Sequence, residues 1–329
     1  MTSRMLDIQL TDADAEAALR ADARAGLTAS PKHLPPKWFY DARGSELIEL
    51  ITQLPEYYPT RTERALLEQH VDEIARLSGA DTIVELGSGS SSKTRLLLDA
   101  FERTGTLRRY VPLDVSESAL RQALDALVAD FPELVLHGVV GDFTRQLDGL
   151  PVGPGRRMIA FLGGTIGNLL PAERAAFLRR VRAQLRPGEQ LLLGTASVTD
   201  VRVLLPAYDD AAGVTAEFNR NVLRVLNRTL GADFDIEAFT HRAVWDVTNE
   251  WIEMWLVAQR DMRVHVADLD LAVDFAAGEH MCTEVSAKFR IATVLSFLQA
   301  AGFAITRMWT DPDDRFALTL ATATGPAQP

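Results

Sequence analysis

The sequence feature that most limits the fold is a regular alternation of short apolar segments with amphipathic helical segments. Strand-like apolar segments lie at residues 82–86, 109–113, 135–140, 157–162 and 190–193, and helical spacing occurs at residues 92–103, 116–129 and 171–184. Strands that alternate with helices form right-handed βαβ units, in which the strands lie parallel. The sequence therefore predicts an α/β, Rossmann-like fold with a doubly wound, mainly parallel sheet.

The pattern outside this region predicts a second domain. Helical spacing occurs at residues 12–25, 44–53, 60–77 and 202–230, and strand-like patterns occur at 241–259 and 263–275. A helix at 291–301 and strands at 303–310 and 315–323 then complete the first domain. We predict that residues 63–198 and 287–329 form the cofactor-binding domain. Residues 1–62 and 199–286 are expected to form an α+β substrate-binding domain.

Composition excludes several classes of partner. The net charge of −11 disfavours nucleic acids and anionic membranes, which bind clustered Lys and Arg residues. A single cysteine, Cys282, and scattered histidines predict no metal site. No segment approaches the roughly 18 apolar residues of a membrane helix, and the N-terminus lacks a basic segment followed by an apolar one. We expect a soluble, cytoplasmic protein that acts on a small molecule, with a monomer as the default state.

The strongest local motif is the segment Ile83-Val-Glu-Leu-Gly-Ser-Gly-Ser-Ser-Ser92, in which an apolar strand leads into a glycine-rich turn and a helix. Gly87 and Gly89 remove side chains where a backbone must approach a ligand, and a helix N-terminus carries partial positive charge. By itself this motif also fits an ordinary tight turn between a strand and a helix.

Two further acidic strand ends strengthen the motif. Asp114 ends the second strand, 25 positions beyond Gly89, where an acid faces the ribose hydroxyls of a bound adenine nucleoside. Gly141, Asp142 and Phe143 end the third strand, and the Asp142 carboxylate is suited to accept from an adenine amino group. Together the three strand ends predict a site for an adenosyl ligand.

The glycine-rich turn favours S-adenosylmethionine (SAM) over NAD. A dinucleotide needs a third glycine near the pyrophosphate, whereas here Ser90, Ser91 and Ser92 follow Gly89. SAM has no phosphate and carries a cationic sulfonium, to which an acid such as Glu85 is suited. We therefore predict SAM as the ligand.

From about residue 26 to the end, the chain resembles the actinobacterial histidine Nα-methyltransferases of ergothioneine biosynthesis. The matching segments are Leu34–Tyr40, Leu54–Glu63, Val84–Gly89, Phe161–Asn168, Ala207–Thr215, Phe218–Asn221, Ile252–Trp255 and Thr283–Phe289. The resemblance implies a class I methyltransferase that transfers three methyl groups in succession from SAM to the α-nitrogen of histidine. The product would be trimethylhistidine (hercynine), in the first step of the pathway.

The resemblance also implies the residues that bind the acceptor side chain. Glu284 and Ser286 stand two apart on an extended stretch, so their side chains share one face and can take the two imidazole nitrogens. Thr215 and Met254 resemble residues that line the pocket. The residues alone also fit two simpler interpretations. Glu284 and Ser286 fit a solvent-exposed face of a strand, and Met254 fits an ordinary core position.

The same resemblance implies a second set of residues, which bind the α-amino and α-carboxylate groups of the acceptor. Tyr40 and Asn168 are expected to be the catalytic pair that orients the amino group. Tyr57 and Tyr208 resemble ligands of the substrate carboxylate, to which Asn168 is also expected to contribute. Aromatic faces such as those of Tyr40 or Phe218 are suited to the permanent cation of the product.

The predicted cofactor-binding set combines the three strand ends with further positions in the matching segments and beside the glycine-rich turn. It consists of Glu85, Gly87, Ser88, Gly89, Lys93, Asp114, Gly141, Asp142, Phe143 and Gly163.

The chain departs from the family pattern at one place, after the apolar strand that leads to Gly194. The family reads Gly-Thr-Asp-Leu-x-Lys-Asp, whereas this chain reads Gly194-Thr-Ala-Ser-Val-Thr-Asp200, so an acid and a lysine are replaced by Ala196 and Thr199.

Three alternative functions fit parts of the same pattern. An Nα-methyltransferase of tryptophan or another amino acid would keep the fold and the donor, and Glu284 with Met254 favours imidazole over indole. An NAD-dependent oxidoreductase is disfavoured by the missing third glycine. A non-catalytic adenosyl-binding module is disfavoured by the retained set of Tyr40, Asn168 and Glu284.

Overall fold

The computed structural model describes residues 4–89, 93–151 and 153–325. The chain divides into two compact units. Unit 1 comprises Met1–Leu10, Pro59–Val198 and Phe289–Pro329, and unit 2 comprises Thr11–Tyr58 and Thr199–Lys288. Each unit is described by itself.

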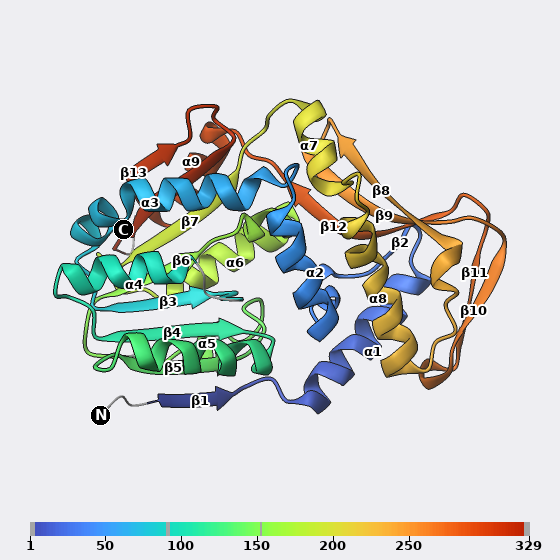
Figure 1. Cartoon of the computed structure of the whole chain (residues 1–329), viewed down its shortest axis with the longest axis horizontal. Coiled ribbons are helices and arrows are strands. Elements are labelled where there is room, and N and C mark those ends of the chain that lie inside the picture. Colours follow the sequence, from blue (N-terminus) through green and yellow to red (C-terminus); the bar gives the residue numbers. More distant parts are fainter. Residues whose placement is uncertain (1–3, 90–92, 152, 326–329) are drawn as a thin grey trace. The chain divides into compact units, whose positions relative to one another are not determined.

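Unit 1 is built on an eight-stranded sheet in the order β1-β5-β4-β3-β6-β7-β14-β13 (Figure 1). The strands are β1 (Arg4–Ile8), β3 (Thr82–Leu86), β4 (Arg109–Asp114), β5 (Val135–Val140), β6 (Arg157–Phe161), β7 (Gln190–Ala196), β13 (Phe303–Thr310) and β14 (Phe316–Ala323). The first six are mutually parallel, and only β14 and β13 run antiparallel to their neighbours. The predicted α/β, mainly parallel sheet is confirmed.

Helices cover this sheet and bury its strands. They are α3 (Tyr58–Ser78), α4 (Thr94–Arg103), α5 (Glu117–Asp130), α6 (Pro171–Ala183) and α9 (Ile291–Ala300), with short 3-10 turns η2 (Leu147–Gly149) and η3 (Thr165–Asn168). Every residue of β3 and of β6 is buried, as expected for parallel strands covered on both faces. The order of the strands reverses direction between β3 and β6, so a ligand is expected at the carboxyl ends of these strands.

The N-terminal strand β1 corrects the predicted domain boundary. Residues 1–10 were assigned to the substrate-binding domain, but β1 pairs in parallel with β5 at the edge of the unit 1 sheet. The register runs from Arg4 opposite Leu136 to Ile8 opposite Val140. Most residues of β1 are exposed, so the strand carries little apolar alternation and its pairing could not be predicted from the sequence.

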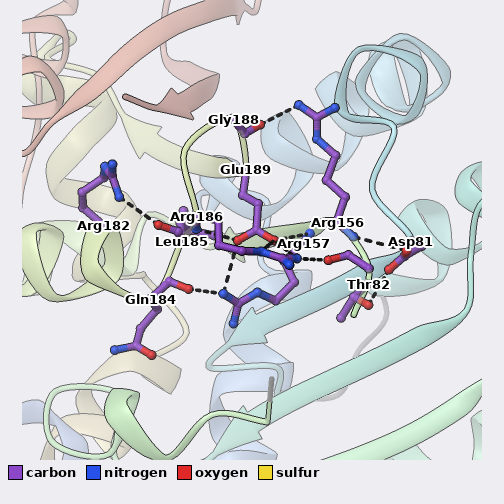
Figure 2. A network of polar contacts seen from close by, with 11 residues as sticks. Asp81, Thr82, Arg156, Arg157, Arg182, Gln184, Leu185, Arg186, Gly188 and Glu189 are labelled. Carbon is purple, nitrogen blue, oxygen red and sulfur yellow. Dashed lines mark hydrogen bonds and ion pairs between the residues drawn. The ribbon is translucent and has the colours of Figure 1, made fainter. Parts of the chain in front are cut away.

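A buried ion-pair network lies at the amino ends of β6 and β7 (Figure 2). The Glu189 carboxylate accepts from the backbone N–H of Arg157 at 3.1 Å and of Arg186 at 2.7 Å, and both guanidinium groups also donate to it. Although burial opposes ionisation, these N–H donors keep the pKa of Glu189 below its usual range. The network stands at the edge of the sheet opposite the carboxyl ends, so we interpret it as structural.

Unit 2 contains a four-stranded sheet in the order β2-β12-β9-β8 and a separate hairpin of β10 and β11. Its strands are β2 (Lys32–His33), β8 (Phe239–Asp246), β9 (Trp251–Ala258), β10 (Met262–Val266), β11 (Leu271–Phe275) and β12 (His280–Ala287). Its helices are α1 (Asp12–Thr28), α2 (Ala42–Gln53), α7 (Val201–Tyr208) and α8 (Val214–Leu230), with 3-10 turns η1 (Pro36–Phe39), η4 (Ile236–Ala238) and η5 (Ala267–Leu269).

The helical segment predicted at residues 202–230 forms two helices, because residues 209–213 between α7 and α8 are not helical. Gly213 adopts a φ of 75°, in the left-handed region that favours glycine. The Asp210 carboxylate accepts from the backbone N–H groups of Val214 at 3.0 Å and Thr215 at 2.8 Å, which satisfies the start of α8. The strand-like segments predicted at 241–259 and 263–275 form strands, and each of them folds into a hairpin, β8–β9 and β10–β11.

Among the described residues, no helix is both long enough and apolar enough to cross a lipid bilayer.

Candidate functional site

The glycine-rich turn of unit 1 follows the carboxyl end of β3. Gly87 and Gly89 have φ angles of 71° and 49°, which explains the need for glycine at both positions. The Ser88 hydroxyl is buried and has no hydrogen-bond partner among the residues that the structure describes. A buried hydroxyl of this kind is a candidate ligand-binding group. Ser90, Ser91 and Ser92, which carried the choice between SAM and NAD, lie outside the described residues.

Asp114 connects this turn to the neighbouring strand end. Its carboxylate accepts from the backbone N–H of Gly89 at 2.9 Å and of Ser116 at 3.0 Å. Burial raises the pKa of Asp114, and these two N–H donors lower it. The backbone N–H of Gly141 also donates to the Asp114 carbonyl oxygen at 2.9 Å. The structure thus brings together the first, second and third strand ends that the sequence analysis selected.

The third strand end is built around Asp142 and Phe143. One Asp142 carboxylate oxygen accepts from the backbone N–H and from the hydroxyl of Thr144, at 2.8 and 2.5 Å. The Phe143 ring packs edge-on against Phe161, with the ring centroids 5.2 Å apart. These contacts hold the end of β5 beside the end of β6.

Glu85 of β3 is hydrogen-bonded to side chains of two neighbouring elements of unit 1. Its carboxyl group is buried and accepts from the Tyr110 hydroxyl at 2.6 Å and from the Thr94 hydroxyl. Burial raises the pKa of Glu85 to about 7, although both hydroxyl groups and Lys93 lower it. The described contacts of Glu85 therefore join β3, β4 and α4, and a direct contact with the sulfonium stays a prediction.

Glu63 of α3 was not among the predicted residues, although it is fully buried and contacts two predicted cofactor-binding residues. Its carboxylate accepts from the backbone N–H of Gly163 at 2.8 Å and forms an ion pair with Lys93. A Cβ atom at Gly194 would lie 2.1 Å from Glu63 Oε1, so a larger residue there would displace this carboxylate. Glu63 lies on the same helical stripe as buried Leu66 and Leu67, and a charge on an apolar stripe is the signal that could have revealed it.

Asn168 ends the 3-10 turn η3, which follows the carboxyl end of β6 through Gly163 and Gly164. The side chain of Asn168 is half-buried and makes no hydrogen bond with the described residues. Asn168 belongs to unit 1 and Tyr40 to unit 2, so the pairing of these two residues on the amino group stays a prediction.

In unit 2, a β-bulge in β12 decides which side chains face the core. Met281 lies opposite Leu256 of β9, whereas Glu284 lies opposite Met254 and Ser286 opposite Ile252. The register shifts between Cys282 and Glu284, so the inward positions change from odd to even numbers. Without this bulge, Glu284 and Ser286 would point to the other face.

Thr283, the extra residue of the bulge, is held by a buried polar chain. Its hydroxyl contacts the Asn219 side-chain oxygen at 2.6 Å and the Met254 carbonyl oxygen at 3.0 Å. The Asn219 amide donates to His241 Nδ1 at 2.8 Å, and His241 Nε2 in turn donates to the Tyr208 carbonyl oxygen at 2.8 Å. Burial lowers the pKa of His241, in agreement with a neutral ring in this arrangement.

The predicted ligands Tyr208 and Ser286 lie together on this face. Their hydroxyl oxygens are 2.9 Å apart, and the Lys288 ammonium donates to both at 2.7 Å. Burial raises the pKa of Tyr208, so its hydroxyl stays protonated. Tyr57 contributes a ring packed edge-on against Tyr208, with the ring centroids 6.1 Å apart.

The remaining predicted residues of unit 2 occupy α8 and its neighbours. Thr215 and Met254 are buried, and Glu284 is half-buried. Tyr40 is 38% exposed and packs its ring against Phe218, with the ring centroids 5.5 Å apart. Phe218 is itself buried, so Tyr40 is the more accessible aromatic face of the two.

The departure at Ala196 and Thr199 leaves the end of β7 intact. The Ala196 carbonyl oxygen accepts from the Phe289 backbone N–H at 2.9 Å, and the Ser197 N–H donates to the Arg315 carbonyl oxygen at 2.9 Å. These bonds use the backbone alone, so they do not depend on the missing acid and lysine.

Known proteins match this chain over nearly its whole length. The chain is 56% identical to the histidine N-alpha-methyltransferase of Mycolicibacterium smegmatis over 98% of this chain and 99% of that protein. It is 54% identical to the enzyme of the same name from Mycobacterium tuberculosis, over 92% of this chain and 94% of that protein. It is 35% identical to the ergothioneine biosynthesis protein 1 of Neurospora crassa, over 68% of this chain and 25% of that protein.

A solved SAM-dependent methyltransferase from Clostridium acetobutylicum shares the fold with a TM-score of 0.50 and 11% identity, over 85% of this chain and 98% of that chain. The fold is therefore that of the Rossmann-like class I methyltransferases. The sequence profile of a family described as "Histidine-specific methyltransferase, SAM-dependent" matches residues 19–323. The chain belongs to this family of SAM-dependent, histidine-specific methyltransferases.

Proposed function

We propose that this protein transfers methyl groups from SAM to the α-amino nitrogen of L-histidine, in three successive steps that end at trimethylhistidine. The observation that carries the proposal is the inward face of β12, where the bulge places Glu284 and Ser286 opposite Met254 and Ile252. The names of the mycobacterial relatives support the same acceptor and the same nitrogen.

The chemistry of imidazole fits this face of β12. A neutral imidazole has one N–H donor and one unprotonated nitrogen acceptor. The Glu284 carboxylate can accept from the N–H, while the Ser286 hydroxyl can donate to the other nitrogen. An apolar side chain would form no hydrogen bond with either group, which costs more binding energy than a missing methylene does.

The described residues at the carboxyl ends of β3, β4 and β5 fit a bound SAM. The buried Ser88 hydroxyl without a partner and the left-handed turn at Gly87 and Gly89 are the observations that support this fit. Asp114 would hold the ribose hydroxyls and Asp142 the adenine amino group. When bound, SAM supplies a methyl group that is already activated by the sulfonium, so the donor needs no further activation by the protein.

The work left to the protein is to position a neutral amine and to exclude water. A free α-amino group has a pKa near about 8, so a modest environmental effect gives the reactive form at neutral pH. Asn168 and Tyr40 would orient this nitrogen, and Tyr57 and Tyr208 would bind the carboxylate of the same amino acid. Holding the amine in line with the methyl group can by itself supply a large part of the rate enhancement.

The pathway is inferred from the product and from the relatives. Trimethylhistidine would be the first product on a route from histidine to ergothioneine. The Neurospora crassa relative is named for that pathway and matches 68% of this chain. We therefore place the reaction at the first step of ergothioneine biosynthesis.

The proposal is tested by mass spectrometry of each of the twenty amino acids after incubation with the protein and SAM. We expect histidine alone to gain methyl groups, with a trimethylated end product. Methylation of tryptophan instead would keep the donor and overturn the acceptor. Failure to methylate any amino acid, in a protein that binds SAM, would overturn the proposed activity.

Glu284→Gln serves as the matched variant in the same assay. The glutamine keeps the size of the side chain and one acceptor oxygen but removes the negative charge. We expect kcat/KM for histidine to fall about tenfold to a hundredfold, the usual effect of losing a hydrogen bond to a charged group. SAM affinity should stay within about twofold of wild type, which separates an acceptor defect from misfolding.

A further inference from the structure

Lys288, the residue that follows β12, has no role in the mechanism above. Its side chain is buried, with 3% of the residue exposed. Among the described residues its Nζ atom donates to the hydroxyls of Tyr208 and Ser286, and it forms no ion pair. Lysine is rarely buried in proteins without a negatively charged partner.

The three side chains form a closed triangle of polar atoms. Lys288 Nζ lies 2.7 Å from each hydroxyl oxygen, and the two hydroxyl oxygens lie 2.9 Å apart. An ammonium group only donates, so each hydroxyl accepts from it. In this arrangement one hydroxyl hydrogen lies between Tyr208 and Ser286. Because Lys288 holds both oxygens, both hydroxyl hydrogens can turn to a bound ligand, that of Ser286 to the imidazole and that of Tyr208 to the carboxylate.

Among the described residues, the Glu284 carboxylate is the one charge that favours the ammonium form of Lys288. Burial lowers the pKa of Lys288 to about 7, and the more distant Glu284 carboxylate only partly opposes this effect. A second negative charge beside the triangle would favour the ammonium form. The proposed acceptor brings such a charge, because every free amino acid carries an α-carboxylate.

We propose that Lys288 is a specificity-determining positioning residue, whose ammonium selects acceptors with a free α-carboxylate through the Tyr208 hydroxyl. The inference rests on the proposed function and adds to it the residue that discriminates amino acids from amines. Because Lys288 occupies a lone pair of the Tyr208 oxygen, the phenolic O–H is directed toward the carboxylate. The charge of Lys288 adds attraction that is only weakly screened in a buried site.

The test compares the binding of histidine and histamine, which differ only by the carboxylate. Both would be titrated calorimetrically into the full-length protein in the presence of S-adenosylhomocysteine, which prevents turnover. For wild type we expect histidine to bind at least about tenfold more tightly than histamine. In Lys288→Met, we expect histidine affinity to fall by at least about tenfold and histamine affinity to change by less than about threefold.

Two further variants keep the test decisive if Lys288→Met does not fold. Lys288→Arg retains the positive charge and should retain most of the preference for histidine. Tyr208→Phe keeps the aromatic ring packed on Tyr57 and should lose the same preference as Lys288→Met. The S-adenosylhomocysteine affinity of every variant reports whether the protein is folded.

Each outcome has a defined meaning. Equal weakening of histidine and histamine would overturn the inference and assign Lys288 to the ring-binding part of the site or to general stability. Equal affinity of wild type for the two ligands would also overturn it. Failure of the wild-type methylation assay would instead overturn the proposed function, and that assay uses no Lys288 variant.

Discussion

At the scale of single residues, unit 1 contains buried carboxyl groups that accept hydrogen bonds from other protein groups. Glu85 is 3% exposed and is bound by the hydroxyls of Thr94 and Tyr110. Burial raises its pKa to about 7, whereas an unfolded glutamate titrates near 4.5. A group whose pKa is raised on folding stabilises the folded state most at low pH.

We therefore expect Glu85 to make unfolding depend on pH between about 4.5 and 7. The free energy of unfolding of wild type relative to Glu85→Gln should fall across this window by about 1–3 kcal/mol. Glutamine keeps a carbonyl oxygen for both hydroxyl donors, so the comparison isolates the charge. Urea denaturation at a series of pH values measures the effect, and parallel curves for the two proteins would contradict it.

At the scale of secondary structure elements, the bulge in β12 determines which side chains lie on the face proposed to bind the acceptor. Thr283 holds the bulge through contacts with Asn219 and the Met254 carbonyl oxygen. The same polar chain continues through His241 to the carbonyl of Tyr208 at the end of α7. Four elements that carry predicted acceptor residues, β12, α8, β9 and α7, are thus joined by one buried network.

We expect Thr283→Val to weaken histidine binding more than SAM binding. Valine keeps the shape but leaves the Asn219 oxygen without its partner, which costs about 1–3 kcal/mol. The KM for histidine should rise, while SAM affinity, a property assigned to unit 1, should change little. Thr283→Ser keeps the hydroxyl and should restore wild-type KM, so equal defects in the two variants would point away from the hydrogen bonds.

At the scale of the whole molecule, the Glu189 network and the predicted site residues of unit 1 lie at opposite edges of its sheet. The Glu189 network joins the amino ends of β6 and β7 (Figure 2), whereas Gly163 and Asn168 follow the carboxyl end of β6. Substitutions at the two edges should therefore have separable effects on stability and on catalysis.

Glu189→Gln should destabilise the protein by about 2–4 kcal/mol at neutral pH, because two arginines lose a buried anionic partner. The pKa of Glu189 is lowered on folding, so its contribution is present above the unfolded pKa and is lost as the pH falls below about 4.5. Thermal unfolding at pH 7 and at low pH measures this dependence. The kcat and KM of the folded enzyme should match wild type, and a changed KM would contradict a purely structural network.

The sequence by itself determined most of the architecture of unit 1 and the strand ends at which a ligand is expected. Local apolar periodicity predicts parallel strands, and acids at successive strand ends meet at one sheet edge because parallel strands share a direction. The contact between Asp114 and Gly89, 25 positions apart, is a direct result of that rule. The short matching segments also indicated the family, because they occur in both units and are therefore more specific than the glycine-rich turn alone.

The tertiary structure alone decided features that depend on distant partners. The edge strand β1 became visible only through its pairing with β5, since its own residues are mostly exposed. The roles of Glu63 and Lys288 follow from their contacts in the folded protein. Glu63 contacts Lys93 and Gly163. Lys288 contacts Tyr208 and Ser286. The bulge at Thr283 reverses the inward face of a strand, and no periodicity within β12 could predict this change, because Asn219 of α8 and the backbone of β9 hold it.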